Sequence, residues 1–190
     1  MSPLPQERRY SYADLLQWDD GTRYELYDGR PLALASPSDV HQEISIELST
    51  QLHTYLRGKK CKVYTAPFDA RIFEEEGDDP ESVDTVLQPD LMVVCDPNKV
   101  DRRGVHGAPD LIVEILSPST AQYDRLIKFN LYQRAGVREY WIIDPTARVV
   151  STYTLENGKY QAAAYGADSS VRVGILDDCT IDLSTVFPET

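Results

Sequence analysis

The most constraining feature of this sequence is the stretch from Ala108 to Pro145, APDLIVEILSPSTAQYDRLIKFNLYQRAGVREYWIIDP. Its pattern predicts a strand, a turn, a helix and a second strand. The segment from Asp110 to Leu116 is apolar, rich in β-branched residues, too short for a helix and bounded by prolines, which indicates a buried strand. The segment Ser117-Pro118-Ser119-Thr120 should break this strand and supply hydroxyls that can cap the following helix.

The helix is predicted over Gln122 to Ala135. Its apolar side chains recur at helical spacing, and Gly136 suits the left-handed residue that ends many helices. The members of this apolar stripe are Tyr123, Ile127 and Leu131. Glu139 to Asp144 then forms a second short apolar run, which we interpret as a strand.

Glu114 does not fit the strand that contains it. Its neighbours on both sides are apolar, and a buried carboxylate without a partner costs several kcal/mol. Something must therefore compensate this charge. An arginine such as Arg134 or Arg138 could do so, but buried ion pairs are poor stabilisers, which favours a functional role for Glu114.

Length and composition fit one domain of 190 residues with an ordinary apolar fraction of 42%. We expect the core over about residues 38–145, an N-terminal helix and hairpin over 10–35, and β-additions over 147–187. No apolar run is long enough to cross a membrane, and the N-terminus lacks the apolar core of a signal peptide, so we expect a cytoplasmic protein. Three cysteines without a CxxC pair predict reduced thiols and no zinc site.

The net charge of −12 opposes nucleic-acid binding by bulk electrostatics, because such proteins usually present a basic surface. Much of the negative charge falls in Glu74 to Asp84, which we interpret as a flexible acidic loop.

The other elements follow from their patterns. A short helix is expected from Tyr10 to Asp20 and a long one from Asp39 to Arg57, and Asp28-Gly29 and Asn157-Gly158 each predict a β-hairpin turn. The remaining strands are expected over Lys62–Phe73 with a break at Pro67, over Thr85–Cys95, and near Val171 and Ile181, with a polar loop over Pro97–Gly107. The resulting fold class is α/β (α+β), a mixed sheet flanked by helices with extra N- and C-terminal β-hairpins.

Two segments repeat one pattern: Pro89-Asp90-Leu91-Met92-Val93-Val94 and Pro109-Asp110-Leu111-Ile112-Val113-Glu114. If the two strands are neighbours, Asp90 and Glu114 can converge near one surface of the sheet. Two carboxylates of this kind are oxygen ligands that suit Mg²⁺ or Mn²⁺. Lys128 on the following helix could orient or help to deprotonate a water molecule and stabilise charge on a phosphoryl oxygen.

Each of these residues also has a purely structural interpretation. Lys128 could form only a surface ion pair with Asp124, and Asp90 and Asp110 could be polar strand-entry residues. Glu25 could face solvent in plain alternation. His41 could be a third ligand, a donor to phosphate or an ordinary residue at a helix start.

The segments QPDLMVV, APDLIVEILSPST and YQRAGVREYWIIDP, together with Asp124 and Lys128, resemble the Uma-two family, whose members are inferred to be restriction endonucleases. YELYDG and His41 also resemble this family, which belongs to the PD-(D/E)XK nuclease-like superfamily. The resemblance implies a restriction-endonuclease-like core of helix, three strands, helix and strand. It also implies divalent-metal-dependent cleavage of DNA, with Asp90 and Glu114 as metal ligands.

One position departs from the superfamily pattern, because Leu116 stands where the catalytic lysine is usual. The resemblance suggests that Lys128 has taken over this role, with Glu25, His41 and Asp110 as further residues that could line the site. The sequence leaves two alternatives open: a catalytically silent binding module, or a metal-dependent hydrolase of a small phosphorylated substrate. A homodimer with a basic cleft between protomers would reconcile DNA binding with the overall charge.

Overall fold

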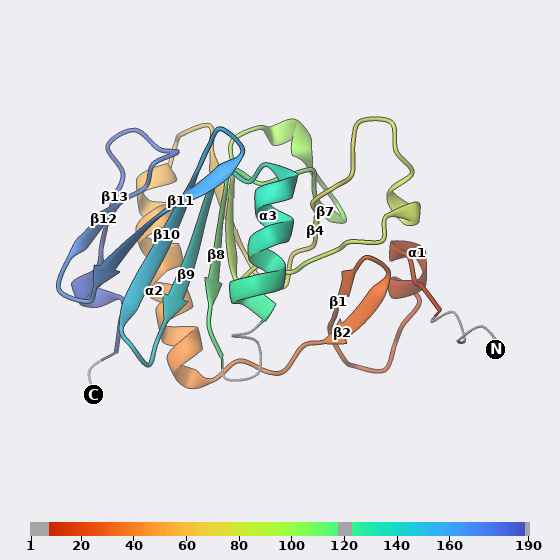
Figure 1. Ribbon diagram of the computed structural model, residues 1–190, viewed down its shortest axis with the longest axis horizontal. Coiled ribbons are helices and arrows are strands. Elements are labelled where there is room, and N and C mark those ends of the chain that lie inside the picture. Colours follow the sequence, from red (N-terminus) through yellow and green to blue (C-terminus); the bar gives the residue numbers. More distant parts are fainter. Residues whose placement is uncertain (1–7, 118–122, 189–190) are drawn as a thin grey trace.

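A six-stranded mixed sheet forms the centre of the computed structural model, which describes residues 8–117 and 123–188 (Figure 1). The strand order is β11-β10-β9-β8-β5-β3, in which β8 and β9 are parallel and the other neighbours are antiparallel. The strands are β3 (Lys62–Thr65), β5 (Leu91–Val94), β8 (Leu111–Ile115), β9 (Glu139–Asp144), β10 (Val149–Glu156) and β11 (Lys159–Gly166). The predicted mixed fold class is confirmed.

Helices α2 (Asp39–Leu56) and α3 (Phe129–Ala135) cover opposite faces of this sheet (Figure 1). Helix α2 begins after Ser38, whose side chain accepts a hydrogen bond from the His41 backbone N–H, and it buries one apolar stripe against the sheet. The short strands β12 (Ser170–Arg172) and β13 (Thr180–Asp182) pack on the same face as α2. The order helix, three strands, helix and strand agrees with the core that the sequence implied.

Smaller elements surround this core. They are α1 (Tyr12–Leu15), β1 (Tyr24–Tyr27), β2 (Arg30–Ala33), β4 (Ala70–Arg71), β6 (Val100–Asp101) and β7 (Gly104–His106). The predicted turn joins β1 to β2, with Asp28 and Gly29 at positive φ angles of 51° and 73°. The prediction of a polar loop over Pro97–Gly107 was wrong, because this segment contains β6 and β7. These two strands form a small sheet with β4 in the order β4-β7-β6, in which β7 pairs with both of the others.

The helix that precedes β9 differs from the prediction in phase. Its first part is a π-helix, Tyr123–Lys128, and only Phe129–Ala135 is α-helical. The wider π turn shifts the buried face, so that Lys128 and Tyr132 are buried while Ile127 remains 41% exposed. Residues 118–122, with the proposed capping hydroxyls and the predicted helix start, lie outside the described residues.

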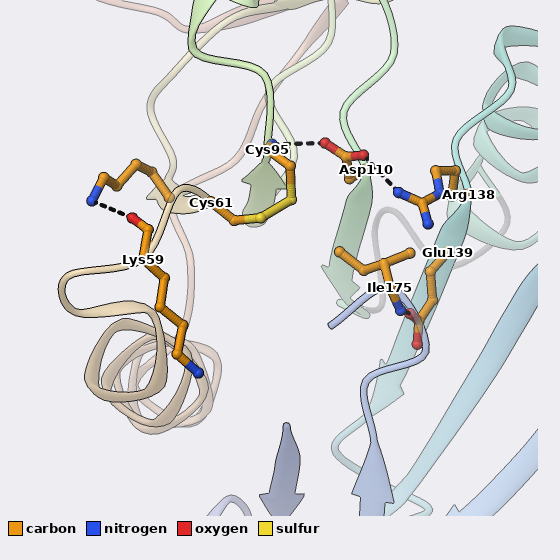
Figure 2. The surroundings of a disulfide bond; sticks show 8 residues. Lys59, Cys61, Cys95, Asp110, Arg138, Glu139 and Ile175 are labelled. Carbon is orange, nitrogen blue, oxygen red and sulfur yellow. Dashed lines mark hydrogen bonds and ion pairs between the residues drawn. A yellow bond between two sulfur atoms is a disulfide. The ribbon is translucent and has the colours of Figure 1, made fainter. Parts of the chain in front are cut away.

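The expectation of reduced cysteines was also wrong for two of the three. Cys61 and Cys95 form a disulfide that joins the start of β3 to the end of β5 (Figure 2). The register pairs Lys62 with Val94, which brings the two cysteines opposite each other one position further along. Neither a CxxC motif nor an even cysteine count could signal this pair, because it is created by strand register. Cys179 is free and buried.

The acidic segment is anchored at its beginning. Glu74 is buried and pairs with Arg71, a fully buried arginine whose Nη2 also lies 2.6 Å from Asp101 Oδ2. The segment also contains a 3₁₀ turn at Pro80–Ser82. The prediction of a flexible acidic loop over Glu74 to Asp84 was therefore wrong for Glu74, which belongs to a buried ion-pair network.

Candidate functional site

A cleft of about 480 Å³ opens beside the N-terminal half of α2. Five of the six residues singled out from the sequence line it together: Glu25, His41, Asp90, Glu114 and Lys128. They come from β1, α2, the entry to β5, β8 and the π-helix, so elements far apart in the chain meet at one surface.

Asp90 lies immediately before β5, beside the end of β8. Its Oδ2 accepts a hydrogen bond of 2.7 Å from the Ile115 backbone N–H and lies 3.1 Å from His41 Nε2. Both contacts use the same oxygen. Asp90 is thus fixed by the neighbouring strand and by the start of α2.

Asp110 occupies the equivalent place at the opposite end of the same strand pair. Its Oδ2 accepts a 2.7 Å hydrogen bond from the Cys95 backbone N–H (Figure 2). Asp90 accepts an equivalent hydrogen bond from the Ile115 backbone N–H. Its Oδ1 is paired with Arg138 Nη1 at 3.1 Å. Asp110 is not among the residues that line the cleft, because antiparallel pairing places it at the far end of β8.

The charge of Glu114 is compensated by Lys128. Glu114 is 3% exposed, and its Oε1 lies 2.9 Å from Lys128 Nζ and accepts a 2.7 Å hydrogen bond from the Tyr132 hydroxyl. The arginines considered from the sequence are engaged elsewhere, Arg138 with Asp110 and Arg134 over the ring of Phe73. Lys128 is buried, so its ammonium lies inside the protein. The alternative of an ion pair with Asp124 involves a side chain outside the described residues.

Glu25 provides a second carboxylate for the same ammonium. Glu25 is 1% exposed, and its Oε1 lies 3.1 Å from Lys128 Nζ and accepts a 2.8 Å hydrogen bond from the Gln88 backbone N–H. Its Oε2 accepts a hydrogen bond from the Tyr27 hydroxyl. The alternative in which Glu25 faces solvent is therefore wrong.

This network fixes the charge of Lys128. Burial alone would lower the pKa of Lys128, but the adjacent Glu114 and Glu25 carboxylates outweigh it and hold that pKa well above its ordinary value. Burial and the nearby Glu114 charge raise the pKa of the Tyr132 hydroxyl well above its usual range. The raised pKa of Lys128 favours its ammonium form and that of Tyr132 its neutral form, which suits Lys128 to electrostatic stabilisation more than to accepting a proton.

Gln88 is a cleft residue that the sequence did not single out. Its Nε2 donates a 2.9 Å hydrogen bond to Asp69 Oδ1, while its Oε1 is buried and has no hydrogen-bond partner among the described residues. The same holds for His41 Nδ1. One feature of the sequence could have identified Gln88 as a cleft residue. It stands two residues before Asp90, and in an extended segment this spacing puts both side chains on the same side.

The cleft offers carboxylates to a metal ion, but the described side chains do not form a complete coordination shell. Within residues 8–117 and 123–188, no group of three or more histidine, cysteine, aspartate or glutamate side chains is arranged to hold a metal ion. Asp90 and Glu114 are hard oxygen donors that suit Mg²⁺ or Mn²⁺, ions that commonly use one or two carboxylates and complete their shell with water and substrate phosphate. The donors present are compatible with such an ion if other ligands contribute.

Comparison with known proteins gives a consistent result. The sequence model of the Uma2 family, described as "Putative restriction endonuclease", matches residues 12–184. "Uncharacterized protein slr1290" from Synechocystis sp. (strain PCC 6803) is 31% identical over 157 residues, covering 80% of this chain and 77% of that protein. A second Synechocystis protein, "Uncharacterized protein sll1609", is 26% identical over 132 residues, covering 68% of this chain and 70% of that protein.

A crystal structure of "a putative nuclease belonging to DUF820" from Anabaena variabilis has a TM-score of 0.73. The alignment covers 93% of this chain and 97% of that chain with 17% sequence identity, a level that supports a common fold. None of the described helices is long and apolar enough to span a membrane.

Proposed function

We propose, from the premise that the chain belongs to the Uma2 family, that this protein is a Mg²⁺- or Mn²⁺-dependent endonuclease that hydrolyses DNA phosphodiester bonds. In this reaction a water oxygen forms a bond to phosphorus and the bond from phosphorus to the leaving oxygen breaks. The attacking water loses a proton to solvent and the leaving oxygen gains one from solvent, so the products are a phosphomonoester and an alcohol. A bound divalent ion would supply Lewis-acid stabilisation of the phosphoryl oxygens. Asp90 and Glu114 would hold it.

The observation that carries this proposal is the buried Lys128 ammonium, which lies between Glu114 and Glu25 in the cleft that Asp90 lines. A cation held in this way cannot be explained as surface charge. An ammonium held in this position would stabilise negative charge that develops on a phosphoryl group, without reorganisation during the reaction. In this role Lys128 replaces the lysine absent at position 116, where Leu116 is buried in the core.

The alternative of a catalytically silent binding module has one observation in its favour. The chain carries a net charge of −12, which weakens non-specific attraction to DNA. The third possibility, hydrolysis of a small phosphorylated substrate, would tolerate this charge more readily. We also propose a homodimer and a cytoplasmic location.

The decisive test is cleavage of supercoiled and linear DNA by the full chain with Mg²⁺, with Mn²⁺ and with a chelator. We expect cleavage that requires the metal and is lost in Glu114→Gln and in Asp90→Asn. Asp110→Asn is the matched control, because it changes the equivalent aspartate at the far end of the same strands. Absence of cleavage by a folded, metal-loaded wild-type protein would exclude the nuclease function, and turnover of small phosphodiesters under those conditions would support the third possibility.

A further inference from the structure

The acidic side chains of this protein are distributed unevenly along the chain. The sequence has 31 aspartate and glutamate residues, yet residues 48–68 contain none. This acid-free segment comprises the second half of α2, the turn that follows it, and β3. It also contains four of the 19 lysine and arginine residues, all of them within the six residues from Arg57 to Lys62. A protein with a net charge of −12 thus has a locally basic segment.

Four cations make up this basic turn, which we define as Arg57, Lys59, Lys60 and Lys62. All four residues are exposed, and none forms an ion pair with a described residue. The turn that contains Asp177 and Asp178 is close by, because the Tyr55 hydroxyl donates to the Asp177 carbonyl oxygen and Lys59 Nζ lies 3.1 Å from the centroid of the Tyr55 ring. Four cations against two exposed acids still leave an excess of positive charge.

Part of the basic turn has a structural role. Lys62 Nζ donates a 3.0 Å hydrogen bond to the Lys59 carbonyl oxygen, and Lys59 itself lies over the Tyr55 ring. Cations at the end of a helix also offset the negative end of its dipole. Arg57 and Lys60, however, make no hydrogen bond, ion pair or ring contact with the described residues. Local contacts therefore account for Lys59 and Lys62 but not for Arg57 and Lys60.

The acid-free segment leads from the basic turn to the cleft. Strand β3 runs from Lys62 to Thr65, and Thr65, Ala66 and Pro67 line the cleft. Three residue steps along a strand span about 10 Å. This distance corresponds to about three base pairs of duplex DNA. β3 is the last strand of the central sheet, so no other strand of that sheet covers its outer edge. A polyanion bound in the cleft can therefore reach the basic turn along β3.

The largest acidic segment lies away from this path. In Figure 1 residues 74–84 lie to the right of the sheet, whereas α2 and the turn that follows it lie on the left. Repulsion between charges separated by more than about 10 Å is largely screened at 0.1 M salt. The net charge of the chain therefore opposes DNA binding less at the basic turn than the total of −12 indicates.

We propose that the basic turn binds backbone phosphates of a DNA duplex whose scissile phosphate lies in the cleft, about three base pairs from the cleft edge. The inference rests on the proposed function, because it takes the cleft as the place where DNA is cleaved. Contacts of this kind are independent of base sequence, and they position the duplex.

An anionic membrane surface fits the basic turn less well. Segments that lie on membranes combine basic residues with exposed apolar ones. The large apolar side chains that are exposed in the described part of the chain all lie outside the acid-free segment or at the cleft. They are Leu16, Val40, Ile46, Leu126 and Ile127.

The test compares two double variants that change the net charge equally. Arg57→Gln with Lys60→Gln alters the basic turn, and Arg102→Gln with Lys159→Gln is the control. All four residues are exposed and have no partner among the described residues, so neither variant removes a described contact. Binding of a fluorescent duplex of about 20 base pairs is measured by anisotropy over a series of salt concentrations. A chelator is present, so that no metal-dependent cleavage occurs.

The salt dependence gives a quantitative expectation. Each phosphate contact contributes about 0.9 to the slope of the logarithm of the binding constant against the logarithm of the salt concentration. We expect the basic-turn variant to lower the magnitude of this slope by about 1.8 and to weaken binding about tenfold or more at 0.1 M salt. The control variant should have the slope and affinity of wild type.

Cleavage assays with Mn²⁺ give a second readout. In the basic-turn variant we expect a higher KM for duplex DNA and an unchanged kcat, because the basic turn contacts DNA away from the scissile phosphate. A dinucleotide phosphodiester is too short to reach from the cleft to the basic turn. Wild type and the variant should therefore hydrolyse it at the same rate.

The outcomes separate this inference from the nuclease proposal. An unchanged salt slope in the basic-turn variant would overturn the inference, even if the protein cleaves DNA. Wild type that binds no duplex at low salt would overturn it as well, and binding to vesicles of phosphatidylserine and phosphatidylcholine in place of DNA would assign the basic turn to a membrane. Duplex binding that depends on the basic turn, without cleavage in the presence of metal, would support the inference while refuting the nuclease function.

Discussion

Lys128 stabilises two buried acids at once, and its removal should be costly. In Lys128→Met the carboxylates of Glu114 and Glu25 lose their shared cation, and breaking a buried ion pair by removing one partner costs about 3–5 kcal/mol. We expect the free energy of unfolding, measured in urea, to fall by this amount. The exposed Lys159→Met is the control. A Lys128→Met protein as stable as wild type would contradict the network.

The pH dependence of this contribution follows from the raised pKa of Lys128. A lysine whose pKa is higher in the folded state stabilises fully below its unfolded value of about 10.4, and the contribution is lost as pH rises through the folded value. The stability difference between wild type and Lys128→Met should therefore stay constant between neutral and mildly alkaline pH. A difference that shrinks near neutrality would show that Lys128 is not held as an ammonium.

Asp110 should matter for stability and not for the cleft. Asp110→Ala removes the acceptor of the Cys95 N–H and the partner of Arg138, and leaving a backbone donor without a partner costs about 1–3 kcal/mol. We expect a loss of this size in the free energy of unfolding. DNA cleavage and Mn²⁺ affinity should be those of wild type, and a loss of either would place Asp110 in the functional site.

At the scale of elements, the π-helix decides which side chains reach the site. In an uninterrupted α-helix the stripe through Ile127 would be buried, whereas here Lys128 and Tyr132 are buried and Ile127 is 41% exposed. We therefore expect Ile127→Ser to change the free energy of unfolding by less than about 1 kcal/mol. Tyr132→Phe, which loses the hydroxyl bonded to Glu114, should cost about 1.5–3 kcal/mol. The reverse ranking, measured in urea, would indicate an α-helical phase.

The disulfide connects two strands that are already hydrogen-bonded. It closes a loop with a sequence separation of 34, for which the chain-entropy estimate is about 3–4 kcal/mol. We expect Cys61→Ala combined with Cys95→Ala to lower the free energy of unfolding by about 2–4 kcal/mol, and reduction of wild type to have the same effect. Cys179 should not contribute, because burial raises the pKa of its thiol to about 11 and slows its reaction. Equal stability with and without reductant would exclude a stabilising disulfide.

Periodicity and turn chemistry were sufficient for most elements. The strand Glu139–Asp144 and the helix that starts at Asp39 were predicted with the observed starts, and the two hairpins form around Asp28-Gly29 and Asn157-Gly158. The sequence also indicated that Glu114 needs a partner, but not which one. The identity of that partner depends on the π turn, which has no signature in apolar spacing. Gln88 was missed for a related reason, since an unpartnered amide oxygen is visible only once the surrounding side chains are placed.

At the scale of the whole molecule, β11 ends the sheet and pairs with β10 on one side only. Alternate residues of β11 direct their backbone N–H groups away from β10. The Tyr160 N–H donates in this direction to the Gln133 side chain, whereas Ala162 and Ala164 lie in the part of the edge after Lys159, where the strand has no charged side chain. Such edges pair with other strands. We expect two copies to pair antiparallel through β11, a symmetric contact that closes. Light scattering should give a dimer for wild type and a smaller mass for Ala162→Pro; a monomeric wild type would refute this interface.

The β5–β8 strand pair has an aspartate at each end, and each aspartate holds the two strands together. The register of this pair is therefore fixed twice. Either end is anchored by its own carboxylate to a backbone N–H of the partner strand, so chemistry can change at one end while the other still fixes the register. The far end therefore offers a template for engineering. Replacing Arg138 there would release Asp110 Oδ1 and create a second open carboxylate on a scaffold that already supports one.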